Sequence, residues 1–139
     1  MEVVLNKSYG GFELSEKGYL LWAEKLGAPI YEYVYDVWGN KNCYVKSVPF
    51  SSKSKHKIYS FIDYGDELPN DFNEKAILKV EECDRTNKYL IETIKELGTD
   101  ASGRYSRLEI INVPDDVAAD YVIDYYDGYE KIHKKVQVW

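Results

Sequence analysis

The chain has 139 residues, a formal net charge of −6 and an apolar fraction of 45%. A length of this order suits one domain, and this much apolar material excludes a chain that is disordered throughout. The acidic balance disfavours general binding to nucleic-acid backbones, and no stretch approaches the roughly 20 apolar residues that span a bilayer. The most unusual count is 14 tyrosines, against 3 Trp and 4 Phe.

The first part of the chain predicts a strand followed by a helix. An apolar run at residues 3–5 favours the strand. Ser15 is a suitable N-cap for the helix, and Gly27 followed by Pro29 ends it. The loop between the two elements contains adjacent glycines, which free the backbone to turn.

The middle of the chain favours β-structure. Tyrosines alternate with other residues from residue 30 onward, and residues 30–50 therefore predict two strands, joined by a turn at residues 39–40. Residues 57–62 predict a further strand. The polar, basic residues 51–57 between them, which include His56, suit a solvated loop, and contact with a phosphate or an acidic partner is the alternative.

The last part predicts a second helix and more strands. Asp84 can cap a helix that carries an apolar stripe and ends at Gly98. Residues 108–113 and 121–125 predict strands. A turn at Asp127 and Gly128 leads into residues 129–139. We expect this segment to form a strand, with an irregular helix as the alternative.

These elements together predict an α+β fold with a mainly antiparallel sheet and two principal helices packed on one side. No linker divides the chain, so we expect a single domain over residues 1–139. Residues 30–83 are a candidate β-rich insertion within it.

Motifs at both ends of the chain resemble a family of small phage and bacterial proteins that has no assigned activity. The N-terminal motif is VLNKSYGGFELS at residues 4–15. The C-terminal motifs are LGTDASG at 97–103, VPDDV at 113–117, YDGYE at 126–130 and the final Trp139. The resemblance implies a protein that belongs to phage genomes and acts in the cytoplasm of a bacterial host, and it assigns no catalytic residues.

The first candidate site is the glycine loop between the first strand and the first helix. Main-chain N–H groups at adjacent glycines can approach an anion, and the following helix N-terminus favours negative charge. A tight turn that needs glycine for its geometry is the alternative. The residues that we expect to contact an anion or nucleotide here are Asn6, Lys7, Tyr9, Gly10 and Gly11.

The second candidate site follows Gly103 and contains two of the three arginines in the chain. A guanidinium group can hold a phosphate or a carboxylate, and a tyrosine ring can stack on a base. We therefore add Arg104, Tyr105 and Arg107 to the predicted anion or nucleotide site, with solvated charge beside a strand as the alternative.

The aspartates, cysteines and histidines give weaker indications of a metal site or a catalytic site. The aspartates near the C-terminus could hold a divalent metal, but most of them occupy positions that turns prefer. Neither cysteine has a metal-ligand neighbour, and no nucleophile motif accompanies either histidine, so we expect no metal and no hydrolytic triad. The residues concerned are Asp115, Asp116, Asp120, Asp124, Asp127, Cys43, Cys83 and His133.

We therefore expect a non-catalytic accessory protein of phage type, without a cofactor, that inhibits or sequesters a component of host defence. Its partner would be a host protein or a phosphorylated nucleotide signal, not a membrane or a nucleic acid. A metal-dependent enzyme acting on a nucleotide and a structural, homo-oligomeric phage component are the alternatives. Most tyrosines fall in predicted strands, where aromatic residues are favoured. The loop residues Tyr9 and Tyr105 are the two tyrosines to which we assign function.

Overall fold

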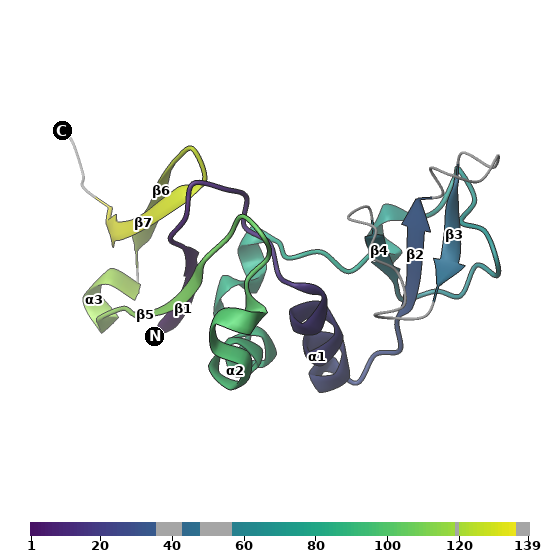
Figure 1. Ribbon diagram of the computed structural model, residues 1–139. Coiled ribbons are helices and arrows are strands. Elements are labelled where there is room, and N and C mark those ends of the chain that lie inside the picture. The colour runs from purple at the N-terminus through teal and green to yellow at the C-terminus, as the bar shows by residue number, and fades with distance from the viewer. Residues whose placement is uncertain (36–42, 48–56, 119, 136–139) are drawn as a thin grey trace. The chain divides into compact units, whose positions relative to one another are not determined.

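The computed structural model describes residues 1–35, 43–47, 57–118 and 120–135 (Figure 1). The chain divides into two compact units, of which unit 1 comprises Met1–Lys25 and Val80–Trp139 and unit 2 comprises Leu26–Lys79. Helices and strands are both present, and the strands that the structure describes pair in antiparallel fashion, which confirms the α+β prediction. The predicted turn at residues 39–40 and His56 lie outside the described residues.

Unit 1 contains two antiparallel strand pairs. Strand β1 (Glu2–Asn6) pairs with β5 (Leu108–Asn112), and β6 (Tyr121–Tyr126) forms a hairpin with β7 (Tyr129–Lys134). Alternate residues of a strand point to opposite faces, and the inward-facing apolar residues of both pairs meet in one cluster. Its members are Val3, Leu5, Ile111, Val113, Val117, Ala118, Ile123 and Ile132.

The first helix has the ends that the sequence predicts. Helix α1 (Glu16–Leu26) begins after Ser15, whose hydroxyl accepts the N–H of Gly18 at 3.0 Å. It ends at Gly27, which has a positive φ of 71° that suits glycine.

The second helix begins later than predicted, and its cap is a different residue. Helix α2 (Lys88–Leu97) is capped by Asn87, whose side chain accepts the N–H groups of Tyr89 and Leu90. Asp84 lies in the preceding 3-10 turn, η2 (Glu82–Thr86), where its carboxylate accepts the Glu81 N–H at 2.9 Å. Because the Asp84 carboxylate already accepts a hydrogen bond within this turn, a different side chain, that of Asn87, caps the first N–H groups of α2. A further 3-10 turn, η3 (Gly98–Ala101), follows α2, and α3 (Asp115–Ala118) is a single helical turn.

Unit 2 is a small sheet in the order β3–β2–β4, formed by Tyr44–Ser47, Tyr31–Tyr35 and Lys57–Ser60, with a 3-10 turn, η1 (Glu74–Ala76). Tyr33 on the central strand is fully buried. Its hydroxyl donates to the Gly65 carbonyl at 2.9 Å and accepts the Tyr64 N–H at 3.0 Å. Buried tyrosines with satisfied hydroxyls are ordinary core residues, and part of the high tyrosine count is explained in this way.

The described strands are divided among three separate sheets. Two of these sheets belong to unit 1 and the third to unit 2. No helix in the described part of the chain is long and apolar enough to cross a membrane.

Candidate functional site

The side chain of Asn6 joins three loops at one end of unit 1. It is completely buried, and its amide nitrogen donates to the carbonyls of Gly10 at 2.7 Å, Gly128 at 2.9 Å and Ser8 at 3.2 Å. Its amide oxygen accepts the Arg107 N–H at 3.0 Å. Because Asn6 is the last residue of β1, these bonds fix the loop after β1, the turn of the β6–β7 hairpin and the loop before β5 in one arrangement.

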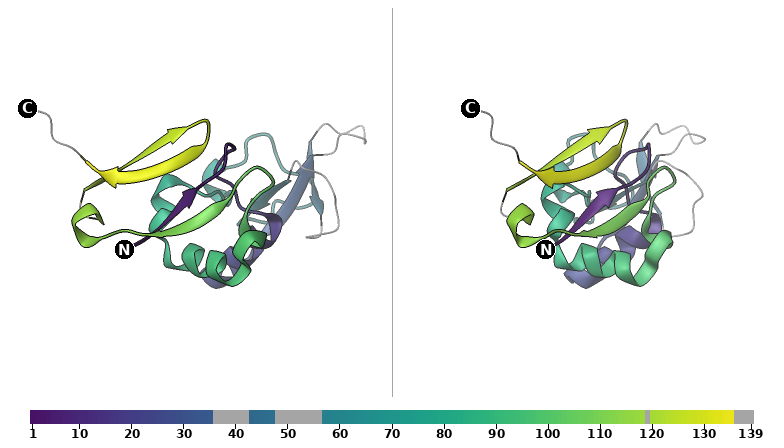
Figure 2. Two further views of the ribbon diagram at one scale, coloured as in Figure 1. Left: turned by 60° about the vertical axis from the view of Figure 1, so that its left-hand side comes forward. Right: turned by 90° about the vertical axis from the view of Figure 1, so that its left-hand side faces the viewer.

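Two glycines allow the same three loops to come into van der Waals contact. A Cβ atom placed on Gly10 would lie 1.9 Å from the carbonyl oxygen of Tyr105, and one on Gly128 would lie 1.9 Å from the carbonyl oxygen of Gly10. Real side chains do not tolerate such distances. The loops therefore meet backbone against backbone, at the end of unit 1 that both Figure 1 and Figure 2 show uppermost.

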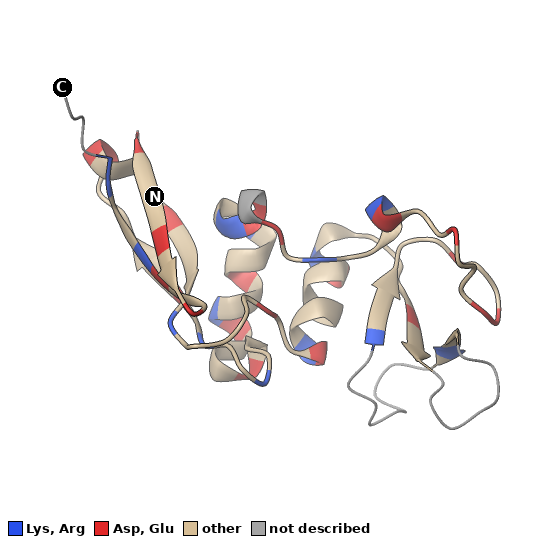
Figure 3. Ribbon diagram, turned by 90° about the horizontal axis from the view of Figure 1, so that it is seen from above, with Lys and Arg blue, Asp and Glu red and all other residues tan. Residues whose placement is uncertain are grey.

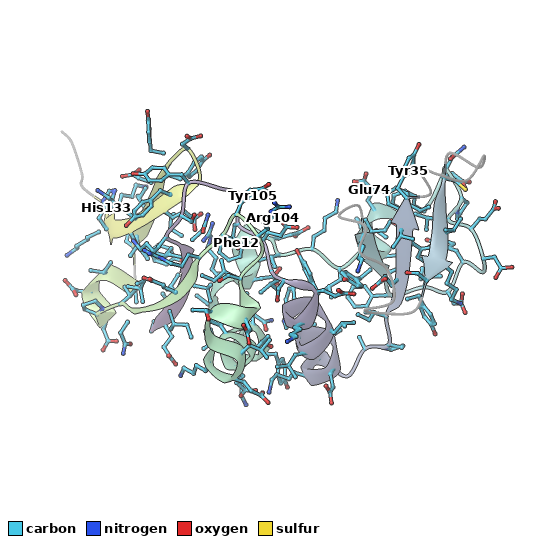
Figure 4. All side chains as sticks on the ribbon, viewed as in Figure 1. Phe12, Tyr35, Glu74, Arg104, Tyr105 and His133 are labelled. Atoms are coloured by element: carbon cyan, nitrogen blue, oxygen red, sulfur yellow. The ribbon has the colours of Figure 1, made fainter. Side chains whose placement is uncertain are left out.

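Four exposed tyrosines lie in or next to these three loops, and we call Tyr9, Tyr105, Tyr125 and Tyr126 the tyrosine tip. Tyr9 and Tyr105 are loop residues, whereas Tyr125 and Tyr126 are the last two residues of β6, just before the hairpin turn. The exposed fractions of these four residues are 69%, 63%, 76% and 80%, whereas no other large hydrophobic side chain among the described residues exceeds 45%. Figure 4 shows Tyr105 and its neighbour Arg104 on the loop before β5. Scattered single exposures are normal on a protein surface, but a group of this size at one place marks a candidate interaction site.

A hollow of about 530 Å³ lies at the tip. Its lining consists of Tyr9, Asp124, Tyr125, Tyr126, Tyr129 and Lys131. Inside it the rings of Tyr9 and Tyr129 are 5.4 Å apart at 32°, and the ammonium of Lys7 lies 5.2 Å from the Tyr129 ring centre. These aromatic and cation–π contacts fix the half-buried ring of Tyr129 between Tyr9 and Lys7.

A buried ion pair between Arg85 and Glu130 connects the elements next to the tip. The guanidinium of Arg85 forms two parallel hydrogen bonds with the carboxylate of Glu130, one of them at 2.6 Å, and also donates to the Val4 carbonyl. The Phe12 ring lies 4.6 Å from that guanidinium. Glu130 also accepts the main-chain N–H of Asn6 at 2.7 Å. The pair thus ties η2 to β7 across β1.

The structure brings the two predicted anion-binding segments together, but most of their polar groups have internal partners. The Lys7 ammonium donates to the Glu130 carbonyl at 2.7 Å. Arg107 lies 3.3 Å from Glu109, and the Arg104 guanidinium lies 5.4 Å from the ring of Tyr105. Gly11 is exposed and has open space around it. Anion binding at these residues stays a prediction, and their observed contacts are those of a scaffold for the tip.

The C-terminal aspartates are spread over the surface of unit 1. Asp116 lies 3.9 Å from Lys134, and Asp124 lies 2.5 Å from His133. Asp127 adopts a positive φ of 52° in the hairpin turn. Among the residues that the structure describes, no group of three or more acidic, His or Cys side chains could hold a metal ion. Cys43 is a free, half-buried thiol in unit 2, and the side chain of Cys83 lies outside the described part of the structure.

His133 gives one pH-dependent prediction. Its bond to the Lys134 carbonyl, and then its bond to Asp124, raise the pKa of the imidazole above its ordinary value of 6.5. A raised pKa means that the folded state favours the protonated form, so this contribution to stability is complete below the ordinary pKa and is lost as the pH rises through the folded pKa. We expect Asp124→Asn to lower the pKa of His133, as measured by NMR titration; an unchanged pKa would contradict the pairing.

Adjacent glycines allow a direct test of the scaffold. Gly10→Ala should separate the loops because its methyl group meets the Tyr105 carbonyl, whereas Gly11→Ala should be tolerated because no atom lies within 4 Å. We expect Gly10→Ala to cost about 1–3 kcal/mol and Gly11→Ala to stay within about 0.5 kcal/mol, measured by urea unfolding. Equal effects of the two substitutions would contradict this contact.

The sequence predicts a functional role for Tyr9 and Tyr105, which stays a prediction, and it attributes most of the other tyrosines, with Tyr125 and Tyr126 among them, to sheet packing. A signal for these two was present, because consecutive strand residues point to opposite faces and cannot both be buried by one layer. The ion pair of Arg85 and Glu130 had no such signal, since 45 residues separate its members.

Comparisons of this chain with protein-family models, with curated proteins and with solved structures give no match. The candidate site therefore stands on its own geometry.

Proposed function

We propose that this protein is a non-catalytic binding protein that docks onto another protein through the tyrosine tip. The observation that carries the proposal is that the four large hydrophobic residues with the highest exposure in the described part of the chain lie in, or directly beside, three loops that one buried asparagine joins. Tyrosine is enriched in protein interfaces because it offers a large, amphipathic contact area and has few rotatable bonds to immobilise.

The rigid base of the tip also supports binding. Loops that are already ordered lose less conformational entropy on association than mobile loops do. Asn6, Gly10 and Gly128 hold the backbone of the tip in place, so only the tyrosine side chains need to become ordered when a partner binds. The phage setting that the sequence resemblance implies makes a host protein the partner that we propose, with inhibition as the consequence.

A phosphorylated nucleotide is the second candidate partner, because the hollow has a volume typical of small-molecule sites. Its tyrosine rings could stack on a base. However, Lys131 is the one cationic residue among the described residues of its lining, and Asp124 lies opposite it in the hairpin. The nearby Lys7 ammonium already donates to the Glu130 carbonyl. Phosphate recognition usually relies on several cations or clustered N–H groups, so the hollow fits a protein side chain better than a phosphate.

Site-specific photo-crosslinking tests the proposed function. A benzophenone amino acid would replace Tyr105 or Tyr126 in turn, and Tyr89, a 40% exposed tyrosine on α2, would serve as the matched control position. We expect the two tip positions, and not position 89, to crosslink the same polypeptide in host-cell extract. Equal crosslinking from position 89, or a nucleotide retained by the purified protein without any crosslinked polypeptide, would refute the proposal.

A further inference from the structure

Strand β6 leaves one of its edges unpaired. Within the described residues, β6 and β7 form a two-stranded sheet, and β7 is the member of the pair that lies along β1. The Asn6 N–H and the Lys7 ammonium both reach Glu130 on that side. The opposite side of the hairpin therefore presents β6 as an edge strand of six residues.

The register shows which main-chain groups face this edge. Tyr126 pairs with Tyr129 across the two-residue turn at Asp127 and Gly128, both of which have positive φ, as in a type I′ hairpin. The pair that closes such a turn exchanges its hydrogen bonds, and hydrogen-bonded pairs then alternate along the ladder. The N–H and C=O groups of Tyr121, Ile123 and Tyr125 consequently point away from β7. No described residue bonds to them.

Such an edge is a template for one more strand, and proteins that do not use it usually protect it with lysine, proline or a bulge. β6 has no lysine, proline or bulge, and Asp124 is its one charged residue: its sequence is YVIDYY, and it pairs with β7 in an unbroken register. The hollow at the tip lies beside the same strand, because Asp124, Tyr125 and Tyr126 belong to its lining. Strand-adding sites combine these two features, since main-chain bonds give affinity and an adjacent pocket selects alternate side chains.

The charge of the edge indicates the chemistry of the added strand. β6 carries Asp124 and no basic residue, and it is bounded by Asp120 and Asp127, both exposed. Neither bounding aspartate forms an ion pair with a described residue. The basic residues of the hairpin lie on β7, across the ladder from the edge. Figure 3 colours the lysines among them blue. A cationic side chain entering the hollow would meet tyrosine rings and Asp124. Lys131 also lines the hollow, and the Asp124 carboxylate is bonded to His133, so the tyrosine rings and the aspartates that bound β6 contribute most of the attraction.

We propose that β6 accepts an extended, lysine- or arginine-bearing segment of a partner protein as an added strand, an inference that rests on the protein-binding function proposed above. A second copy of this chain fits less well. Antiparallel pairing of two β6 strands centred on Ile123 would place Asp120 of one copy beside the Tyr126–Asp127 end of the other, and like charges near each other across a strand pair are destabilising.

The test uses the whole protein and a synthetic probe, the capped hexapeptide Lys-Val-Lys-Val-Lys-Val, with Glu-Val-Glu-Val-Glu-Val as its charge control. The readout is amide hydrogen exchange by NMR. We expect the lysine peptide to slow exchange at Tyr121, Ile123 and Tyr125 by at least about tenfold, while the acidic peptide has no effect. Absence of protection, or equal protection by both peptides, would overturn the inference. Protection that grows with protein concentration without peptide would assign the edge to a second copy instead.

A pair of variants tests the main-chain contact itself. Tyr125→Pro removes an edge N–H without touching the bonds to β7, and Tyr125→Val removes the same ring but keeps the N–H. We expect the proline variant to abolish protection by the lysine peptide and the valine variant to retain it. Exchange at Val122 and Asp124, which face β7, reports whether the hairpin is intact in each variant. If protection survives in Tyr125→Pro with an intact hairpin, or is lost equally in Tyr125→Val, strand addition is wrong.

The two proposals can fail separately. Crosslinking from positions 105 and 126 does not require an added strand, so its persistence without edge protection would remove this inference and leave the proposed function in place. If the lysine peptide protects the edge but no host polypeptide crosslinks, strand addition at β6 is retained and the host protein that we propose as partner is refuted.

Discussion

Replacing Glu130 with alanine should unfold most of unit 1 or leave it marginally stable. The substitution leaves the guanidinium of Arg85 buried without its carboxylate, and the side chains of the pair are only 11% and 6% exposed. Breaking a buried ion pair by removing one member costs about 3–5 kcal/mol. A small domain has only about 5–15 kcal/mol of total stability. The Asn6 N–H also loses its acceptor, which adds to the cost.

Hydrogen exchange measured separately for β1 and β2 provides the readout, because the two strands belong to different units and global unfolding need not be two-state. Glu109→Ala is the matched control: Glu109 also pairs with an arginine, but the side chains of that pair are 59% and 45% exposed. Exposed pairs contribute about 0–1 kcal/mol. We therefore expect a large loss of protection in β1 for Glu130→Ala and almost none for Glu109→Ala.

A double variant separates the loss of charge pairing from the loss of packing. In Arg85→Met with Glu130→Gln, no buried charge is left, and the glutamine oxygen can still accept the Asn6 N–H. Apolar replacement of a buried ion pair is often neutral, so the double variant should recover more than half of the stability lost in Glu130→Ala. If it is as unstable as the single variant, the unpaired charge is not the cause.

How far the sequence predicts this protein depends on the distance between the interacting residues. Ser15 and Gly27 identify the ends of α1, and Asp127 with Gly128 identifies the hairpin, because capping and turn chemistry act within a few residues. The cap of α2 is missed by three positions, since Asp84 and Asn87 are both good caps and the choice depends on the turn between them.

The candidate site is predictable in its parts but not in its organisation. Asn6 and Gly10 look like ligand-contacting residues in a strand–loop–helix segment, and only the folded chain shows that their partners are the loops at Tyr105 and Gly128. Those loops are more than 90 residues away in sequence, so no local sequence pattern can indicate that they contact Asn6 and Gly10. The structure thus gives the glycines a packing role and shows that Tyr125 and Tyr126 share a surface with Tyr9.

Gly128→Ala should disrupt the tyrosine tip, through backbone strain at a positive φ and through a steric clash with the loop after β1. Gly65→Ala serves as the control that carries the strain without the clash. The φ angles of the two glycines are almost equal, at 90° and 88°, so a side chain suffers the same backbone strain at both positions, about 1–2 kcal/mol. Only Gly128 also faces another backbone, since a Cβ atom there would lie 1.9 Å from the Gly10 carbonyl oxygen, whereas no atom lies within 4 Å of Gly65. We expect Gly65→Ala to cost only the strain.

The additional cost at Gly128 comes from moving the hairpin away from the loop after β1. Forcing a methyl group into close-packed structure costs about 1–3 kcal/mol, so Gly128→Ala should lose about 2–5 kcal/mol in total by urea unfolding. The Asn6 bond to the Gly128 carbonyl lengthens with the same movement. Crosslinking from position 126 should then fall while the control position 89 is unchanged. If both glycine variants lose the same stability and the tip still crosslinks, the three loops do not depend on this contact.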